Sequence, residues 1–403
     1  MEINSPRLAS LSSACLQRED SVEGFWEEVA VTGAPIIERA DDDPDSYWVT
    51  FLWRDSGHTN SVSVFGGPTG WTYSGTRMMH LPGTDVWFKT CRVRGDARFT
   101  YWLAENRSDE TWAAILRQDP SHWILDPLNA NVYPDKDPFT TVVALPDAPA
   151  QPWIIPEARA EVGTISKDAM DSTVLNNRRN IWIYKPYGYD TSGDPYPLLV
   201  CLDGEEYTEL IPTPTILDNL IRSGRIPPVA AVFVGNAEGA RSKELTCSER
   251  FDRFLTTELL PRARQQLHVT NRTERTILAG SSYGGLAACY SALRHPDLFG
   301  NVLSQSGSFF WSPEDDPEPG LLMRQFARSN IRSVRFFLEV GLMEGIRPSR
   351  PNGPTQLSAN RHMRDVLTAK GLHVAYAEYN GGHDFVSWRG SFADGLMHLT
   401  RSW

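Results

Sequence analysis

The chain has 403 residues, a formal net charge of -11 at pH 7, 41% hydrophobic residues and 22% charged residues. These values are typical of a folded globular protein, they exclude a disordered chain, and the length allows two to three domains. The negative charge argues against non-specific nucleic-acid binding. An anionic substrate would therefore have to be captured by a local group of arginines.

The five cysteines are widely spaced and form no C-x-x-C pair, which is typical of free thiols in a reducing compartment. The first residues lack the apolar core of a signal peptide, and no run of about 18 apolar residues indicates a membrane span. The sequence therefore predicts a cytoplasmic protein with neither a membrane nor a nucleic-acid partner.

The first part of the chain is rich in strand-like segments. Residues 21–31 have apolar side chains at helical spacing and predict a short amphipathic helix. Aromatic and β-branched residues then dominate four predicted strands, at 47–54, 61–65, 85–93 and 98–103. Because no helical pattern separates these strands, they indicate a small antiparallel β-sandwich. We expect this N-terminal all-β sandwich domain to span residues 1–150.

The segment 145–157 contains four prolines and predicts an interdomain linker. Beyond it, strands and helices alternate. The predicted strands are 175–184, 198–202, 229–234, 276–279, 302–306, 334–340 and 372–379. The predicted helices are 216–223, 248–267 with Pro261 kinking or splitting it, 285–293, 321–327, 355–369 and 391–399. This alternation indicates a mostly parallel sheet with helices on both faces, an α/β-hydrolase domain spanning residues 151–403.

A glycine-flanked serine lies between a predicted strand and a predicted helix, in the sequence Gly280-Ser281-Ser282-Tyr283-Gly284. This pattern is typical of a nucleophile elbow, where a sharp turn exposes the serine Oγ and small neighbours let the strand and the helix approach closely. Ser282 is therefore the predicted nucleophile. An ordinary glycine turn is the alternative, since the motif alone also arises by chance.

A second signal follows about a hundred residues later. The predicted strand 372–379 ends in Asn380-Gly381-Gly382-His383-Asp384, which places His383 on a loop at the carboxyl end of a strand. Active sites of parallel sheets lie at that edge. The chain order of serine, acid and histidine is that of α/β-hydrolases, so His383 is the predicted general base.

The triad acid should follow the predicted strand 334–340. Glu344 lies on the loop after that strand and is the preferred acid; Glu339 inside the strand, Asp384 and no acid at all remain open. For the oxyanion hole, the Tyr283 N–H comes directly after the nucleophile. The turn after strand 198–202 makes the Glu205 N–H the second predicted donor, the alternative being a plain strand-ending turn.

Several of these segments resemble the enterochelin (enterobactin) esterase family. They are residues 200–205 (VCLDGE), 278–285 (LAGSSYGG), 303–308 (LSQSGS) and 381–390 (GGHDFVSWRG), and near the start 49–54 (VTFLWR) and 126–129 (DPLN). The resemblance spans nearly the whole chain. One departure is visible, because many family members have glutamine at the position of Ser281.

The resemblance implies a serine esterase that hydrolyses the trilactone backbone of ferric tris-catecholate siderophores such as enterobactin, for intracellular iron release. It also implies Ser282 as nucleophile, His383 as base and Glu344 as acid. The partner would be a small-molecule siderophore, and no metal or other cofactor is expected because the iron arrives with the substrate.

Such a substrate is a flat-faced trianion, so arginines and aromatic rings should surround it. The predicted substrate-binding residues are Trp388, Arg389 and Trp311, together with Arg241 on a mobile basic loop. Trp53 and Arg54 are predicted to reach the substrate as part of a lid. The alternative for each is a core tryptophan or a solvated arginine.

Two other functions stay open. One is a feruloyl-type carbohydrate esterase or an acyltransferase with the same fold. The other is a siderophore-binding module without catalysis, because a fold does not fix a function.

Overall fold

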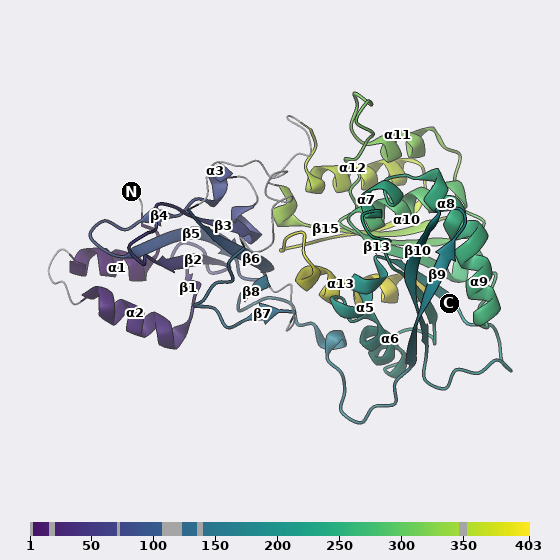
Figure 1. The fold of residues 1–403 in the computed structure, drawn as a ribbon, viewed down its shortest axis with the longest axis horizontal. Coiled ribbons are helices and arrows are strands. Elements are labelled where there is room, and N and C mark those ends of the chain that lie inside the picture. The colour runs from purple at the N-terminus through teal and green to yellow at the C-terminus, as the bar shows by residue number, and fades with distance from the viewer. Residues whose placement is uncertain (1–2, 16–20, 71–72, 107–122, 135–139, 346–352) are drawn as a thin grey trace. The chain divides into compact units, whose positions relative to one another are not determined.

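The computed structural model describes residues 3–15, 21–70, 73–106, 123–134, 140–345 and 353–403 (Figure 1). The chain forms two compact units. The first contains Met1–Pro149 together with Leu342–Arg347 and Asn380–Val386, and the second contains Ala150–Gly341, Pro348–Tyr379 and Ser387–Trp403. Two short loop segments far along the chain thus belong to the N-terminal unit.

The first unit contains two antiparallel four-stranded sheets. One has the order β1 (Ile36–Arg39), β2 (Ser46–Arg54), β5 (Val86–Arg94), β4 (Met79–His80), and the other β3 (Val62–Gly66), β6 (Arg98–Glu105), β8 (Thr140–Ala144), β7 (Val132–Tyr133). Side chains of both sheets form one buried cluster, in which Phe51 and Tyr101 have ring centroids 4.8 Å apart. The four predicted strands are confirmed as β2, β3, β5 and β6.

Helices also cover this sandwich. The helix predicted at 21–31 is confirmed as α2 (Ser21–Thr32), while α1 (Pro6–Cys15) was not predicted. Buried residues of α1 and α2 cluster with Leu52 and Phe88 of the first sheet. Smaller helical turns are Gly67–Thr69, α3 (Tyr73–Thr76) and, in the loop after β15, Leu342–Gly345.

The second unit is built on an eight-stranded sheet with six parallel strands. Its order is β16 (His373–Tyr379), β15 (Arg335–Gly341), β14 (Asn301–Gln305), β13 (Thr276–Ser281), β11 (Leu198–Leu202), β12 (Ala230–Val234), β10 (Asn177–Lys185), β9 (Thr164–Ser172). β10 runs antiparallel to both of its neighbours, β12 and the edge strand β9. The central strands are buried on both faces, as expected for parallel strands covered by helices. All seven predicted strands are confirmed, whereas the mostly exposed edge strand β9 was not predicted.

Helices cover both faces of this sheet: α10, α11 and α12 lie on one side, and α5, α6 and α13 on the other (Figure 1). Their bounds are α5 (Gly204–Glu209), α6 (Thr213–Arg222), α7 (Arg241–Glu244), α8 (Glu249–Phe254), α9 (Leu260–Gln266), α10 (Tyr283–Arg294), α11 (Leu321–Arg328), α12 (Gln356–Ala369) and α13 (Phe385–Thr400), with 3-10 turns at Pro152–Ile154 and Thr273–Arg275. This confirms the predicted α/β-hydrolase architecture. Within the described ranges, no helix is long and apolar enough to cross a membrane.

Two predicted helices differ in detail. The segment 248–267 is α8 and α9 joined by the π-helical stretch Leu255–Leu259, so the split expected near Pro261 is confirmed. Pro261 lies in the first turn of α9, and the wider π turn before it accommodates the ring and the missing N–H. The last helix, predicted at 391–399, already begins at Phe385.

Candidate active site

The nucleophile elbow is formed by Ser282 between β13 and α10. Ser282 has φ 55° and ψ -119°, a conformation that non-glycine residues rarely adopt. A Cβ on Gly280 would lie 2.6 Å from the backbone carbon of Gly284, so only glycine fits there. The half-buried Ser282 therefore occupies the strained strand-to-helix turn that the sequence predicted.

Ser308 contacts the elbow, and sequence reasoning gave it no role. Its Oγ lies 3.2 Å from the Oγ of Ser282, and its N–H donates to the Ser282 carbonyl at 3.0 Å. The Ser282 N–H donates in turn to the carbonyl of Gln305, the last residue of β14. The sequence signal was the small-residue stretch after a strand that neighbours the elbow strand. Its hydrogen bonds hold the side chain and the backbone of Ser282 in place.

His383 and Glu344 form a hydrogen-bonded pair within the first unit. The His383 Nδ1 lies 2.6 Å from the Glu344 Oε2, and the side chains are 32% and 2% exposed. The two loops are also joined by the Met343 N–H, which donates to the Gly381 carbonyl at 3.1 Å. A carboxylate on Nδ1 holds the ring in the tautomer and orientation in which Nε2 serves as the catalytic nitrogen.

The other carboxylates that the sequence left open have different partners. The Glu339 Oε1 is buried and accepts hydrogen bonds from Gln305 Nε2 at 2.6 Å and Ser391 Oγ at 2.5 Å. The Asp384 Oδ2 accepts from the Thr100 N–H at 3.2 Å. Of the three candidates, the structure pairs Glu344 with His383.

The two predicted oxyanion donors lie at helix starts. Tyr283 is the first residue of α10, and Glu205 lies in the first turn of α5. N–H groups in the first turn of a helix have no acceptor within the helix. Since α5 follows β11, α10 follows β13, and these strands are parallel neighbours, both helix starts lie at the same edge of the sheet.

Arg241 does not lie on a mobile basic loop as the sequence suggested. It is the first residue of α7, and its Nε and Nη2 donate to both carboxylate oxygens of Asp203 at 2.7 Å. Burial opposes the charge of Arg241, but the hydrogen bonds to Asp203 outweigh it and raise the pKa of Arg241. Local charge pairing, which sequence spacing did not reveal, fixes this side chain.

The tryptophan–arginine pair near the start of the chain lies within the first unit. Arg54 contacts Glu23 at 2.6 Å and Asp85 at 2.8 Å, and its guanidinium lies 5.4 Å from the Trp26 ring centroid. These carboxylates raise the pKa of Arg54 through their hydrogen bonds. Trp53 is half-buried and donates from Nε1 to the Thr59 hydroxyl at 3.4 Å. A ligand would have to compete with these contacts.

The remaining predicted substrate contacts lie in the second unit. Trp388 is 3% exposed and donates from Nε1 to Ser306 Oγ at 3.0 Å, which favours a structural role for its ring. Arg389 is half-buried and donates to Gln151 Oε1 at 2.9 Å. Trp311 is half-buried at the edge of the core. Among the residues that the structure describes, no group of three or more His, Cys, Asp and Glu side chains could hold a metal ion.

A strained serine elbow between a central strand and a helix of a mostly parallel sheet defines a serine hydrolase of the α/β-hydrolase class. The esterase family model matches residues 172–399, and the model described as enterochelin esterase, N-terminal, matches residues 48–154. The chain therefore belongs to the enterochelin esterase family, which confirms the resemblance found in the sequence.

Individual relatives agree with this assignment. The iron(III) enterobactin esterase of Dickeya dadantii is 30% identical over 94% of this chain and 92% of that protein. The Escherichia coli K12 enzyme of the same name is 28% identical over 94% of this chain and 96% of that protein. The crystal structure of ferric enterobactin esterase from Salmonella typhimurium superimposes with a TM-score of 0.77 at 27% identity, covering 94% of this chain and 98% of that one. The crystal structure of the Shigella flexneri enterobactin esterase in the presence of enterobactin superimposes with a TM-score of 0.73 at 27% identity, covering 92% of this chain and 96% of that one.

Proposed function

We propose that this chain is an esterase that hydrolyses the trilactone backbone of a catecholate siderophore, with Ser282 as nucleophile, His383 as general base and Glu344 as the carboxylate that orients it. The observation that carries the proposal is the strained Ser282 elbow in a chain that matches iron(III) enterobactin esterases over both the catalytic and the N-terminal regions. A relative named iron(III) salmochelin esterase, 29% identical over 92% of the chain, fits the same substrate class.

The topology of the sheet supports the proposed triad. Ser282 follows β13 directly, Glu344 comes three residues after β15, and His383 comes four residues after β16. β13, β14, β15 and β16 are consecutive parallel strands, so their carboxyl ends share one edge of the sheet. We therefore expect the short connections after these strands to carry the three proposed triad residues toward that edge.

In the proposed reaction, the Ser282 Oγ attacks an ester carbonyl of the trilactone while His383 Nε2 accepts the hydroxyl proton. The backbone N–H groups of Tyr283 and Glu205 stabilise the tetrahedral oxyanion. His383 then protonates the leaving alkoxide, which opens the ring and leaves an acyl-enzyme. The same nitrogen activates a water molecule that releases the acid and restores Ser282, while Glu344 stabilises the imidazolium formed in each step.

We propose that cationic and aromatic side chains bind the catecholate groups of the substrate. Arg389 and Trp311 are half-buried and suit contacts to an anionic ring system. A ligand would reach Trp53 and Arg54 only by displacing their present partners. Trp388 is buried and donates from Nε1 to Ser306 Oγ, so we assign its ring to the core and not to stacking on the ligand.

The alternatives are less well supported. Both regions of the chain match enterochelin esterases, which favours a siderophore esterase over a carbohydrate esterase or an acyltransferase. The strained serine elbow disfavours a module that only binds. All five cysteines are free, which supports the proposed cytoplasmic location.

Chromatographic product analysis after incubation with ferric and iron-free enterobactin tests the proposal. We expect linear trimer, dimer or monomer with the wild-type protein and none with Ser282→Ala. Ser281→Ala is the matched control, because this buried serine directly precedes Ser282 in the chain. Trilactone cleavage that persists in Ser282→Ala would refute the catalytic role of Ser282. A wild-type protein that cleaves simple aryl esters but no trilactone would refute the proposed substrate.

A further inference from the structure

The four-residue helix α7 is held at both ends by ion pairs. Its first residue, Arg241, pairs with Asp203, and its last residue, Glu244, pairs with Arg179 of β10. A single turn of helix has almost no stability of its own. These two ion pairs therefore fix where α7 lies.

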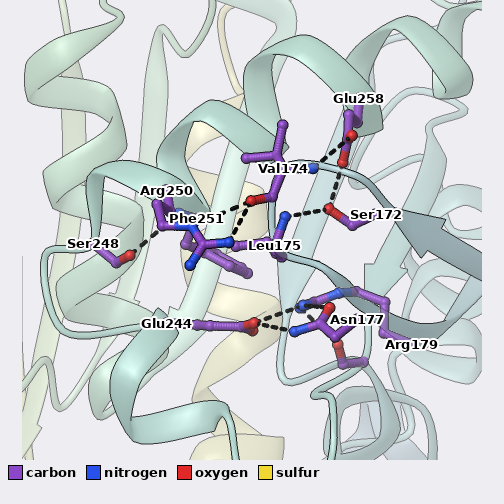
Figure 2. A network of polar contacts seen from close by, with 11 residues as sticks. Ser172, Val174, Leu175, Asn177, Arg179, Glu244, Ser248, Arg250, Phe251 and Glu258 are labelled. Atoms are coloured by element: carbon purple, nitrogen blue, oxygen red, sulfur yellow. Dashed lines mark hydrogen bonds and ion pairs between the residues drawn. The ribbon is translucent and has the colours of Figure 1, made fainter.

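The pair at the C-terminal end of α7 is buried. Arg179 Nη2 lies 2.9 Å from Glu244 Oε1, and the side chains are 0% and 8% exposed. Asn177 Nδ2 donates to the same oxygen at 2.7 Å, and the Arg179 guanidinium lies 4.7 Å from the Phe254 ring centroid. Figure 2 shows Glu244 reaching from its helix to Arg179 and Asn177. A buried, multiply bonded ion pair is rigid, because separating its partners strands a charge in the core.

The pair at the N-terminal end holds the turn after β11. Asp203 is 2% exposed and adopts the left-handed conformation, with φ 56° and ψ 54°. Its carboxylate accepts two hydrogen bonds from Arg241 and one from Asn236 Nδ2, all at 2.7 Å. A strained non-glycine conformation persists only where surrounding contacts hold it in place. The Arg241 and Asn236 hydrogen bonds supply that restraint two residues before the Glu205 amide.

The same contacts reach the elbow. The Arg241 guanidinium lies 5.8 Å from the ring centroid of Tyr283, the residue that carries the other proposed oxyanion donor. A Cβ on Gly284 would lie 2.9 Å from Asp203 Oδ2, so α10 packs directly against this carboxylate. Arg241 thus touches the segment on each side of the proposed oxyanion hole.

We propose that Arg241 and Asp203, anchored through α7 by Glu244 and Arg179, are positioning residues that set the spacing between the Glu205 and Tyr283 amides. This inference rests on the proposed function, because the two amides are its oxyanion donors. It reassigns Arg241: the guanidinium is committed to Asp203 and acts on the reaction through the protein rather than through the substrate. These four side chains are called the α7 clamp below.

The expected effect is on the chemical step. Removal of one oxyanion donor costs about 10²- to 10³-fold in kcat, and a displacement of about 1 Å costs up to about 10²-fold. Loosening the α7 clamp moves a donor without removing it. We therefore expect Arg241→Gln and Asp203→Asn to lower kcat by about 10- to 100-fold while KM changes little.

A matched control pair lies at the other end of α10. Arg294, the last residue of that helix, pairs with Asp252 at 2.9 Å, and the side chains are 40% and 3% exposed, against 37% and 2% for Arg241 and Asp203. A twelve-residue helix is about 18 Å long, so this pair is remote from the elbow. Arg294→Gln and Asp252→Asn should affect folding to a similar degree and leave turnover per active site unchanged.

The full-length variants are compared by hydrolysis of p-nitrophenyl acetate, with active sites counted by fluorophosphonate titration and folding followed by thermal unfolding. Phenylboronic acid gives a second readout, because its serine adduct places an oxygen anion in the oxyanion hole. We expect its inhibition constant to rise as kcat falls in both Arg241→Gln and Asp203→Asn. The double variant should have a kcat no lower than that of the less active single variant. Arg241→Lys should recover part of the activity.

The α7 clamp is refuted if Arg241→Gln and Asp203→Asn, normalised to titrated sites, stay within twofold of the control variants in kcat and in boronate inhibition. It is also refuted if activity merely follows the fall in melting temperature in both pairs. If the wild-type protein binds the boronate but cleaves no trilactone, only the proposed substrate is overturned. The aryl-ester and boronate measurements would still test the role of the α7 clamp.

Discussion

Replacing Glu344 by glutamine tests the pair that orients the proposed base. The carboxylate is 2% exposed and lies 2.6 Å from His383 Nδ1, so its charge acts with little solvent screening. Glutamine keeps the shape but removes the charge, and its amide group no longer selects the tautomer that leaves Nε2 as the catalytic nitrogen. In a serine protease triad the equivalent change lowers kcat about 10⁴-fold. We expect a fall in kcat of about 10²- to 10⁴-fold, which corresponds to about 2.7–5.4 kcal/mol of activation free energy.

The assay is steady-state hydrolysis of p-nitrophenyl acetate and of enterobactin, with KM and kcat determined separately. KM should change little, because Glu344 is not expected to touch the substrate. Asp384→Asn is the control, since this carboxylate accepts a hydrogen bond from the Thr100 amide. A far-downfield proton resonance from the His383 Nδ1–H should be present in the wild type and in Asp384→Asn, and shifted or absent in Glu344→Gln.

Two outcomes would contradict this reasoning. One is a Glu344→Gln protein with more than half of the wild-type kcat. The other is a loss of kcat in Asp384→Asn that exceeds the loss in Glu344→Gln, which would move the acid to the neighbour of the histidine. A parallel loss in both variants with lowered melting temperatures would indicate a folding effect, and counting active sites by fluorophosphonate labelling separates that case.

Two further predictions concern backbone space and surface charge. Gly280→Ala should lower kcat/KM at least 10-fold, because its Cβ would lie 2.6 Å from the Gly284 backbone carbon. Gly24→Ala is the control and should leave kcat/KM unchanged, since a Cβ on Gly24 would have no atom within 4 Å. Equal activity of the two variants would disprove the elbow argument. Hydrogen bonds from Arg361 lower the pKa of Glu378 to about 2, so the pair stabilises the fold above pH 4.5 and this contribution is lost as the pH falls through about 2. Glu378→Gln should therefore lower the unfolding free energy by about 0.5–1 kcal/mol at pH 7, a small value because solvent screens this exposed ion pair. Thermal melts should show a progressively smaller difference between variant and wild type below pH 4.5. A difference that does not change with pH would argue against the ion pair.

Glu339, which the sequence left open as an alternative acid, belongs to a buried hydrogen-bond network. Gln305 receives a hydrogen bond from Tyr207 at 2.8 Å and donates to Glu339 at 2.6 Å, which links α5, β14 and β15 below the carboxyl edge of the sheet. Ser391 of α13 donates to the same carboxylate. Glu339 therefore holds the strands and helices that carry the proposed site.

Local sequence determined the elbow, the order of the strands along the chain and the fold class. The Ser282 turn could be predicted because its constraint is local: two glycines, a strand and a helix are adjacent in the chain. The central strands could be predicted because parallel strands buried on both faces must be continuously apolar. Strand β9 escaped prediction because an exposed edge strand needs no apolar face.

Only the tertiary structure decided the partners of the charged side chains. Sequence spacing left Glu344, Glu339 and Asp384 as candidates, and the fold gave each a different partner. It likewise joined Arg241 to Asp203, 38 residues away in the chain, and placed Trp388 in the core. Charged and aromatic residues carry the same local signal whether they are solvated, ion-paired or catalytic. Their roles depend on contacts between segments remote in sequence, and such contacts are fixed only when the sheet assembles.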